Sequence, residues 1–561
     1  MNLSLSSSLS MRSFFFSFFS AGGSSGRRSW AASPPAGAQI PTSTATPNHR
    51  RIVISVALPK FNEMASVHRP RAGSNMTWFG PGNPYGLVKI RFPQAPVPPM
   101  ADNSQSQPTI RESVRLIARG KLSPVDLVND SLARIEAGNA RLGAFITVTA
   151  DSARAAAIKA GRRVRTGRGG VLAGIPISVK DLIVTIDAPT SLGSRVIPSG
   201  LPAGPDAPAI GRLRRAGAIV IGKANLHEVA LGVTSVNEHF GPVRNPWDPT
   251  RVAGGSSGGS AVAVATGMGL GSVGTDTRGS IRIPSACCGI VGLKPTYGTI
   301  PTDGVFPLAA TLDHIGPMAR SVEDVALLFG VMTGSTRRAK AVLAAVDRKP
   351  GRKKVAVCEY LIRDADHDIG TAIETALKLL ARRGASLVSV EIPELEPALE
   401  ASRVIVLAEA IAYHDELLRR NPDGYGPILK SRLEGGYQLS ALQYVQAEER
   451  RLELLTAYAN LFQEVDCLVG AVLPVAPPKI GTQSVPVAGV ETPLSEAFCR
   501  YNAPQNMTGV PALALPCGFS RTGLPIAMQL VAGSGHEETI LGIGAAYQRE
   551  TDWHTRRPKG P

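Results

Sequence analysis

The sequence predicts an α/β fold, in which helices pack against a layered β-sheet. An apolar, β-branched run at 174–181 ends in lysine and is typical of a buried strand. A helical segment at 208–216 follows, and Gly217 leads into a second short apolar strand at 218–222. Such alternation of strand and helix favours one layered sheet over separate domains. With 43% hydrophobic and 19% charged residues, the composition is that of an ordinary globular protein.

Residues 1–99 differ in composition from the remainder, so we divide the chain into a leader at 1–99 and one domain at 100–561. The leader holds ten Lys and Arg residues against one acid, Glu63, and contributes +9 of the net charge of +16. The high isoelectric point is therefore largely a property of the leader. Net charge gives no reason to expect nucleic-acid binding by the domain.

Three interpretations of the leader remain open. Its Ser-rich, acid-poor start with Arg12 and Arg27 resembles an organelle transit peptide, and the Phe cluster at 14–19 resembles a short secretory segment. The third interpretation, which we favour, is a non-native extension, because Met100 precedes what looks like a fresh start. We expect a cytoplasmic protein, or an organelle-targeted one if the leader is genuine.

The domain becomes regular from Thr109 onward. Ser123 is a plausible N-cap with Pro124 in the first helical turn, followed by apolar residues at helical spacing up to Ile135. Further along we predict a helix at 322–332, a basic loop at 337–354, strands at 355–357, 386–390, 467–469 and 513–516, a helix at 370–383, and a largely helical region at 401–466.

The stretch from Gly254 to Ser280 carries the most chemical information. Two Gly/Ser turns flank a run of small apolar residues, and glycine lets backbone amides point toward a ligand. Ser256, Ser257 and Ser280 are the candidate hydroxyl groups. A serine needs a base to become a nucleophile, and Lys180 at the end of its buried strand is the candidate, because burial makes a lysine neutral more readily.

Four motifs in order resemble the amidase signature family. They are Ser-Val-Lys-Asp (178–181), Gly-Gly-Ser-Ser-Gly-Gly-Ser (254–260), Gly-Thr-Asp-Thr-Arg-Gly-Ser-Ile-Arg (274–282) and Cys-Gly-Ile-Val-Gly-Leu-Lys-Pro-Thr (288–296). The resemblance extends from about Thr109 to His554. It implies a single large domain with a mixed, mostly open β-sheet covered by helices on both faces.

The resemblance also implies a Ser-Ser-Lys triad. Ser280 would be the nucleophile, Ser256 the bridging serine after a cis peptide bond, and Lys180 the base. The backbone amides of Thr277, Arg278, Gly279 and Ser280 would form the oxyanion hole. Ser257 and Asp276 would support these groups.

Arg278 departs from the family, which usually has glycine there. A positive φ at this position would strain an arginine. With an ordinary backbone, its side chain either binds a substrate carboxylate, lines the entrance of the site, or points into solvent so that only its amide is used.

Two further residues bear on the substrate. Arg432 aligns with an arginine that glutamine-using members employ to hold a carboxylate, although a solvated helix-face arginine is the alternative. Cys499 stands where those members have an aspartate that binds the amino group of the substrate, which argues against free glutamine.

No metal or other cofactor is expected. His227 and Glu228 are adjacent and so are poorly placed as joint ligands, and the resemblance makes Asn225, Glu228 and Asn245 scaffold residues. His314 is expected to be structural, since the lysine already serves as base. The six cysteines lack CxxC spacing and are expected to be buried and reduced, and no apolar run is long enough to span a membrane.

The leading prediction is an amidase that converts a small-molecule amide into acid and ammonia or amine. Alternatives are the catalytic subunit of a tRNA-dependent amidotransferase, which works with glutamine and partner subunits, and a non-catalytic scaffold. An α/β-hydrolase elbow at Gly254–Gly258 would need a strand directly before it, where 245–250 is turn-forming. The sequence does not determine the oligomeric state, and a homodimer is one option.

Overall fold

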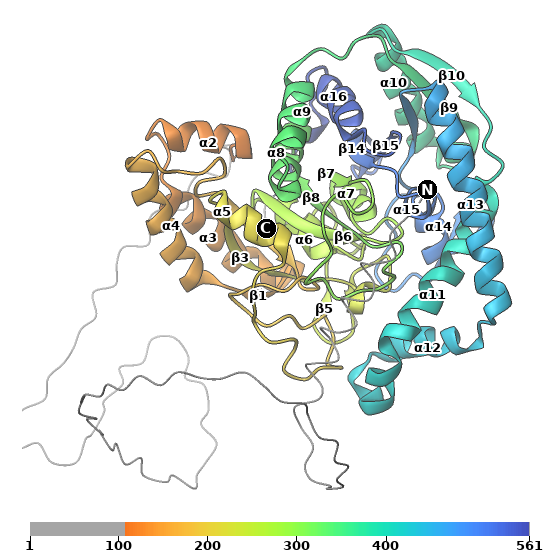
Figure 1. Cartoon of the computed structure of the whole chain (residues 1–561), viewed down its shortest axis with the longest axis horizontal. Helices are drawn as coiled ribbons and strands as arrows, with labels where there is room; N and C mark the ends of the chain where they lie inside the picture. The colour runs from red at the N-terminus through yellow and green to blue at the C-terminus, as the bar shows by residue number, and fades with distance from the viewer. Residues whose placement is uncertain (1–106, 560–561) are drawn as a thin grey trace, which may run out of the picture. The chain divides into compact units, whose positions relative to one another are not determined.

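A computed structural model describes residues 107–559 and places one large mixed sheet at their centre (Figure 1). The predicted α/β class is confirmed, whereas the leader at 1–99 lies outside the described residues. The sheet has 11 strands and two free edges, in the order β1 (Phe145–Val148), β3 (Ile219–Ala224), β2 (Pro176–Lys180), β6 (Gly271–Asp276), β8 (His314–Ala319), β7 (Val291–Lys294), β14 (Ala512–Phe519), β15 (Pro525–Val531), β11 (Cys467–Ala471), β9 (Lys354–Cys358) and β10 (Ser386–Val390).

Strand direction in the sheet is mixed. β2 runs parallel to both β3 and β6, and β9 runs parallel to both β10 and β11. The strands between these two groups pair antiparallel, from β6 through β8, β7, β14 and β15 to β11. Two small ribbons lie outside the sheet, β4 (Val236–Asn237) with β5 (Gly241–Pro242) and β12 (Ser484–Val487) with β13 (Val490–Pro493).

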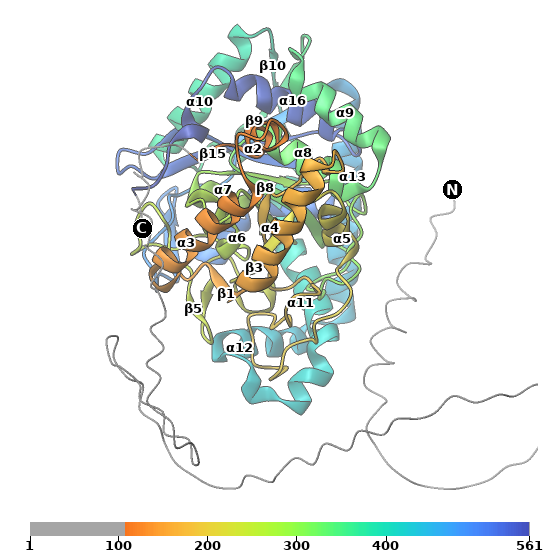
Figure 2. The ribbon, with the colours of Figure 1, turned by 90° about the vertical axis from the view of Figure 1, so that its left-hand side faces the viewer.

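Helices connect the strands and cover the sheet (Figures 1 and 2). The α-helices are α2 (Ile110–Ala118), α3 (Pro124–Leu142), α4 (Ala150–Arg165), α5 (Pro208–Arg215), α6 (Gly258–Ala265), α7 (Arg282–Cys288), α8 (Val322–Thr333), α9 (Thr336–Asp347), α10 (His367–Arg382), α11 (Leu395–Arg420), α12 (Pro427–Gly435), α13 (Ala441–Glu464), α14 (Leu494–Cys499), α15 (Ala503–Met507) and α16 (Glu537–Gln548).

Strand β14 demonstrates that helices lie on both faces of the sheet. Leu513 and Leu515 point to α16, where they pack at Gly544. The intervening Ala514 pairs with Gly292 of β7. On the face to which a side chain at Gly292 would point lies Ser285 of α7. Because alternate residues of a strand face opposite sides, α16 and α7 cover opposite faces.

Helix α3 begins as the sequence predicts. The hydroxyl of Ser123 accepts a hydrogen bond from the amide of Val125 at 3.1 Å, with Pro124 in the first turn of α3. Gly143 ends this helix with a φ of 65°. A left-handed residue closes a helix end at least cost when it is glycine.

The predicted basic loop at 337–354 is wrong, because most of it is helix α9. Ser335 caps the helix by accepting from the amide of Arg338, and Val342 and Val346 are buried one turn apart. The basic residues that suggested a loop lie on the outer side, so their charge says little about the backbone. The other elements predicted after Thr109 are confirmed within a few residues.

Helices α11, α12 and α13 form the helical region predicted at 401–466, at the right of Figure 1. Helix α11 packs against both α12 and α13.

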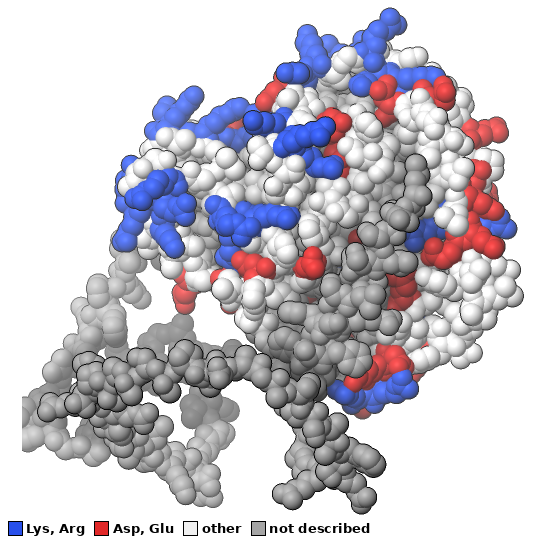
Figure 3. Space-filling model, in the orientation of Figure 1, with Lys and Arg blue, Asp and Glu red and all other residues white. Residues whose placement is uncertain are grey.

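On the face seen in Figure 3, Lys and Arg gather at the left over α4, whose last turn holds Arg162, Arg163 and Arg165, while Asp and Glu line the right edge. The basic patch is therefore remote from the α11–α13 region.

All six cysteines are buried and free, as the sequence predicts. Within the described part of the chain, no helix combines the length and apolar character needed to cross a membrane.

The α9 correction leads to a stability prediction. Val342→Ala should lower the free energy of unfolding by about 1 to 3 kcal/mol, because it leaves a cavity under a docked helix. The exposed Lys340→Ala on the same helix should change it by less than about 0.5 kcal/mol. Urea unfolding of both variants measures this, and equal effects would contradict the packing of α9 described above.

Candidate active site

Lys180 ends β2, a strand that is buried along its whole length between β3 and β6. Its amine is fully buried and donates to Ser256 Oγ and to Thr275 Oγ1, each at 2.7 Å. Burial lowers the pKa of Lys180 to about 7, although the charges of Asp313 and Asp276 oppose this shift. The structure therefore joins two of the predicted site residues, Lys180 and Ser256, around an amine that loses its proton readily.

Thr275 was missed by the sequence analysis. It lies on β6, where it follows the residues that pair with β2. The contact of Thr275 with Lys180 arises because β6 lies directly beside β2 in the sheet. The sequence alone does not give this strand order, so the contact was not predictable from it.

Ser256 and Ser257 lie in the turn that leads into α6. The peptide bond between Gly255 and Ser256 is cis, as the resemblance implied. The carbonyl of Ser256 accepts from the amide of His227 at 3.1 Å and from Ser235 Oγ at 3.1 Å. No strand of the large sheet directly precedes this turn within the described chain, so the α/β-hydrolase elbow is excluded.

Ser257 connects this turn to the Ser280 loop. Its amide donates to the carbonyl of Ser280 at 3.2 Å, and its hydroxyl donates to the carbonyl of Thr275 at 3.1 Å. Ser280 is 7% exposed, whereas Ser256 and Ser257 are fully buried. Of the three candidate serines, Ser280 is thus the least buried.

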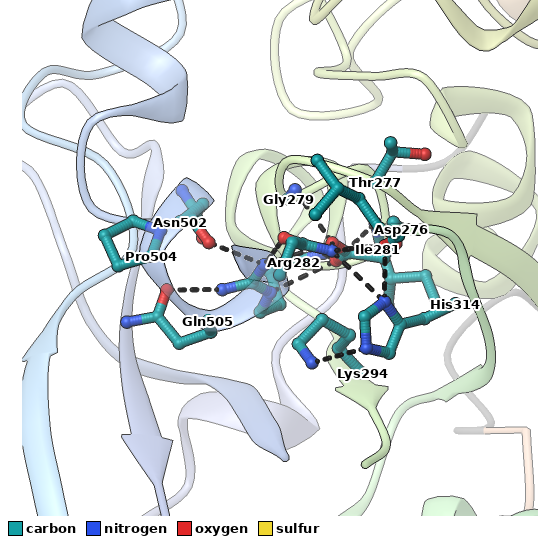
Figure 4. Close-up of polar contacts among 12 residues, drawn as sticks. Asp276, Thr277, Gly279, Ile281, Arg282, Lys294, His314, Asn502, Pro504 and Gln505 are labelled. Carbon is teal, nitrogen blue, oxygen red and sulfur yellow. Dashed lines mark hydrogen bonds and ion pairs between the residues drawn. The ribbon is translucent and has the colours of Figure 1, made fainter. Parts of the chain in front are cut away.

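Asp276 organises the loop that carries Ser280 (Figure 4). Its carboxylate accepts from the amide of Gly279 at 2.8 Å and from that of Ile281 at 3.1 Å. The amide of Gly279, one of the four predicted oxyanion donors, is therefore already engaged in this structure. The amides of Thr277, Arg278 and Ser280 have no acceptor among residues 107–559.

Asp276 is itself held by Arg282, a fully buried arginine to which the sequence analysis gave no role. The guanidinium forms an ion pair with Asp276 at 3.0 Å. Burial raises the pKa of Asp276, but the charge and hydrogen bonds of Arg282 outweigh it and hold that pKa well below the usual range. Arg282 also donates to Gln505, Gln529, Asn506 and the carbonyl of Asn502, which ties the loop to α15 and β15 (Figure 4).

Asp313 is a second buried carboxylate that the sequence analysis missed. It accepts from Thr277 Oγ1 at 2.6 Å and from the amides of Leu308 and Ala309. Burial raises its pKa to about 7. The Ser280 loop is therefore fixed from two sides, by Asp276 within it and by Asp313 through Thr277.

His314 occupies a structural position. Its Nδ1 lies 2.7 Å from the carbonyl of Leu312, and its Nε2 lies 3.1 Å from the amine of Lys294 (Figure 4). Burial lowers the pKa of the imidazole well below its usual range, so His314 is neutral and accepts from Lys294. Lys294 also donates to the carbonyl of Val510 at 2.6 Å.

The three expected scaffold residues anchor loops around the site. Asn225 Nδ2 donates to the carbonyl of Gly143, and Asn245 Nδ2 donates to that of Cys287. Glu228 accepts from Ser194 Oγ at 2.6 Å and from the amide of Gly426 at 3.1 Å, which fixes the start of α12. Across the described residues there is no cluster of three or more His, Cys, Asp or Glu side chains suited to a metal ion.

Arg278 has an ordinary backbone, so the strain considered for it is absent. Its side chain is half-buried and donates through Nη2 to the carbonyl of Leu399 in α11 at 3.3 Å, rather than pointing into solvent. Arg432 is also half-buried and donates through Nη1 to the carbonyl of Leu231 at 3.1 Å. Arg432 is thus only partly solvated, and its predicted role in holding a carboxylate stays a prediction.

Comparisons with known proteins agree on one family. The family model described as Amidase matches residues 126–541. A glutamyl-tRNA(Gln) amidotransferase subunit of Roseiflexus castenholzii is 38% identical over 81% of this chain and 98% of its own length. A crystal structure of an amidase covers 79% of this chain and all of its own, with 35% identity and a TM-score of 0.73.

A second solved structure resembles this chain about as closely as the amidase structure does. It comes from a protein complex described as revealing the origins of an s-triazine catabolic enzyme, and it has 33% identity and a TM-score of 0.76. It covers 81% of this chain and all of its own.

Gly279 yields a prediction about the Ser280 loop. Its φ is 113°, and a Cβ there would lie 2.6 Å from the Cβ of Asn502. Gly279→Ala should lower the free energy of unfolding by about 3 kcal/mol or more, through backbone strain and the clash. Gly298→Ala is the matched control, because Gly298 has a φ of 72° in open space and should cost only about 1 to 2 kcal/mol. Equal losses in urea unfolding would contradict the close contact with Asn502.

Proposed function

Because the chain belongs to the amidase family, whose members act on carbon–nitrogen bonds, we propose that it hydrolyses a carboxylic amide through an acyl intermediate on Ser280. The observation that carries this proposal is the fully buried amine of Lys180, 2.7 Å from Ser256 Oγ and with a pKa lowered to about 7. An amine that is largely neutral near pH 7 is able to accept a proton.

In the proposed reaction, Lys180 takes the proton of Ser256 while Ser256 takes that of Ser280. The Ser280 oxygen attacks the carbonyl carbon of the amide, and the proton returns through the same path to the leaving nitrogen. Water then cleaves the acyl-serine to release the acid. Because an amide nitrogen is a poor leaving group, its protonation as it departs is the step that such a relay assists.

The negative oxygen that forms during attack needs donors nearby. The backbone amides of Thr277, Arg278 and Ser280 have no acceptor among the described residues and lie next to the nucleophile, which supports their assignment to the oxyanion hole. Loss of one such donor typically costs about 3 to 4 kcal/mol of transition-state stabilisation. The ordinary backbone at Arg278 leaves this loop without strain, which supports a catalytic role over a non-catalytic scaffold.

The relatives favour the alternative function over a free-standing amidase. The Roseiflexus protein is named as one subunit of a glutamyl-tRNA(Gln) amidotransferase and matches along 98% of its length. A contribution of this chain to such an enzyme would make glutamine its amide. Cys499, where the glutamine-using members have aspartate, argues for a different amide, and hydrolysis of glutamine by this chain distinguishes the two.

The triad leads to a labelling prediction. A fluorophosphonate probe should modify Ser280 in the wild type, because the probe reacts with activated serines, and should fail to modify Lys180→Ala and Ser280→Ala. Mass spectrometry locates the modified residue, and ammonia release from a panel of amides reports turnover. Modification of Ser256 or Ser257 that persists in Lys180→Ala would contradict the assignment of the nucleophile.

The pKa of Lys180 leads to a prediction on pH. The base must be neutral, so kcat/KM should rise with pH through a pKa of about 7 and then level off. Thr275→Val removes one acceptor of the ammonium form, which should move this limb to lower pH. Rates from pH 5 to 10 measure both effects. A limb near pH 10, or one that Thr275→Val leaves in place, would contradict the role of Lys180.

A further inference from the structure

The 308–313 loop, which leads into β8, borders the loop that carries Ser280. Its last residue, Asp313, accepts a hydrogen bond from Thr277 Oγ1 at 2.6 Å. Thr277 is one of the residues whose backbone amide we assign to the oxyanion hole. Because the hydroxyl and the amide belong to the same residue, a hold on the hydroxyl restricts the direction in which the amide points. The placement of Asp313 therefore bears on the geometry of the hole.

The carboxylate of Asp313 is fixed within its own loop. The oxygen that does not contact Thr277 accepts from the amides of Leu308 at 2.9 Å and Ala309 at 3.1 Å. The amide of Asp313 donates in turn to the carbonyl of Ala309 at 2.8 Å. Since the carboxylate cannot move independently of the 308–313 loop, the position of this loop decides where Thr277 is held.

Two helices hold the loop from outside at Thr311, two residues before Asp313. Glu409 of α11 accepts from the amide of Thr311 at 3.1 Å and also from its hydroxyl. Arg451 of α13 donates through Nη2 to the carbonyl of Thr311 at 3.0 Å. The backbone donor, the backbone acceptor and the hydroxyl of Thr311 are all bonded, so that its position and its orientation are both fixed.

Both helical side chains are themselves placed firmly. Arg451 donates through Nε to the carbonyl of Met507 in α15 at 2.9 Å, and Glu409 is half-buried. Helices α11 and α13 pack against each other. Helix α11 also receives the bond from Arg278 to the carbonyl of Leu399 at 3.3 Å. The loop of the oxyanion hole thus contacts α11 directly through Arg278, and indirectly through the 308–313 loop.

We propose that Glu409 of α11 is a positioning residue, which acts through the 308–313 loop to hold the amide of Thr277 in the oxyanion hole. This inference rests on the proposed function and adds a distant determinant of its rate. Oxyanion donors act on charge that develops in the transition state, so their misplacement lowers kcat more than it raises KM. A displacement of about 1 Å is enough to cost about 100-fold in rate.

Glu409→Ala tests the proposal on the full chain, with the amide that is hydrolysed fastest in the ammonia-release panel. The kcat should fall about 10- to 100-fold and KM should change by less than about threefold, because the lost hold matters in the transition state. The rate constant for fluorophosphonate labelling of Ser280 should fall by a similar factor, since the phosphoryl oxygen of the probe uses the same donors.

Glu416→Ala is the matched control. It removes a carboxylate from the same helix, but Glu416 is exposed and pairs with Arg420 of α11. It should leave kcat, KM and the labelling rate unchanged. Thr311→Val is a milder change at the loop, since it removes the bond from the hydroxyl to Glu409 and keeps the bond from the amide. It should lower kcat in the same way but by a smaller factor than Glu409→Ala.

A double-mutant cycle separates positioning from a general loosening of the fold. Thr277→Val removes the hydroxyl that Asp313 holds and should lower kcat about 10- to 100-fold, whereas Thr277→Ser should restore part of this loss. If Glu409 acts through Thr277, adding Glu409→Ala to Thr277→Val should lower kcat by less than about a further threefold, because the hold is already lost.

Three outcomes would overturn the proposal while the proposed function stands. The first is an unchanged kcat and labelling rate in Glu409→Ala together with Thr311→Val. The second is a fall in kcat that Glu416→Ala reproduces. The third is additivity of Glu409→Ala and Thr277→Val, which would mean that Glu409 acts by another route. Absence of labelling and of amide hydrolysis in the wild type would instead overturn the proposed function, and this inference with it.

Discussion

The burial of Lys180 is the constraint on which the site depends. Its strand has a neighbour on each side, and among the described residues the amine forms hydrogen bonds to the hydroxyls of Ser256 and Thr275 alone. Lowering its pKa from 10.5 to about 7 means that burial destabilises the ammonium form relative to the neutral amine by roughly 5 kcal/mol, compared with a solvated lysine. A parallel strand in the middle of a large sheet is a place where a lysine loses water completely. The sheet thus lowers the pKa of the amine that we propose as the base.

The other buried ionisable groups of the site are stabilised in other ways. Arg282 and Asp276 remain ionised because they pair, and the pair uses its remaining oxygen atoms and N–H groups to fix the Ser280 loop against α15 and β15. Asp313 is buried and has no ion-pair partner within residues 107–559, and burial raises its pKa to about 7. The charge of Lys180 is thus weakened by burial, whereas the charges of Asp276 and Arg282 are kept by pairing.

The sequence predicted what depends on local pattern. Apolar runs and the N-cap at Ser123 located several of the strands and helices, and Gly/Ser turns located the loops that carry Ser256 and Ser280. It missed Thr275, Asp313 and the role of Arg282, because these act across the sheet or between loops far apart in the chain. It also mistook α9 for a loop, since the outward-facing basic residues obscured two buried valines. Arg278 was noticed as a departure, but its contact with α11 required the fold.

The most direct test of the account is the titration of Lys180 itself. NMR of protein labelled with ¹³Cε-lysine follows the ammonium-to-amine transition, and comparison with Lys180→Arg assigns the resonance among the other buried lysines, Lys223 and Lys294. The account predicts a midpoint of about 7 for Lys180. A midpoint near 10.5, the value of a solvated lysine, would contradict the claim that burial in the sheet produces a neutral base.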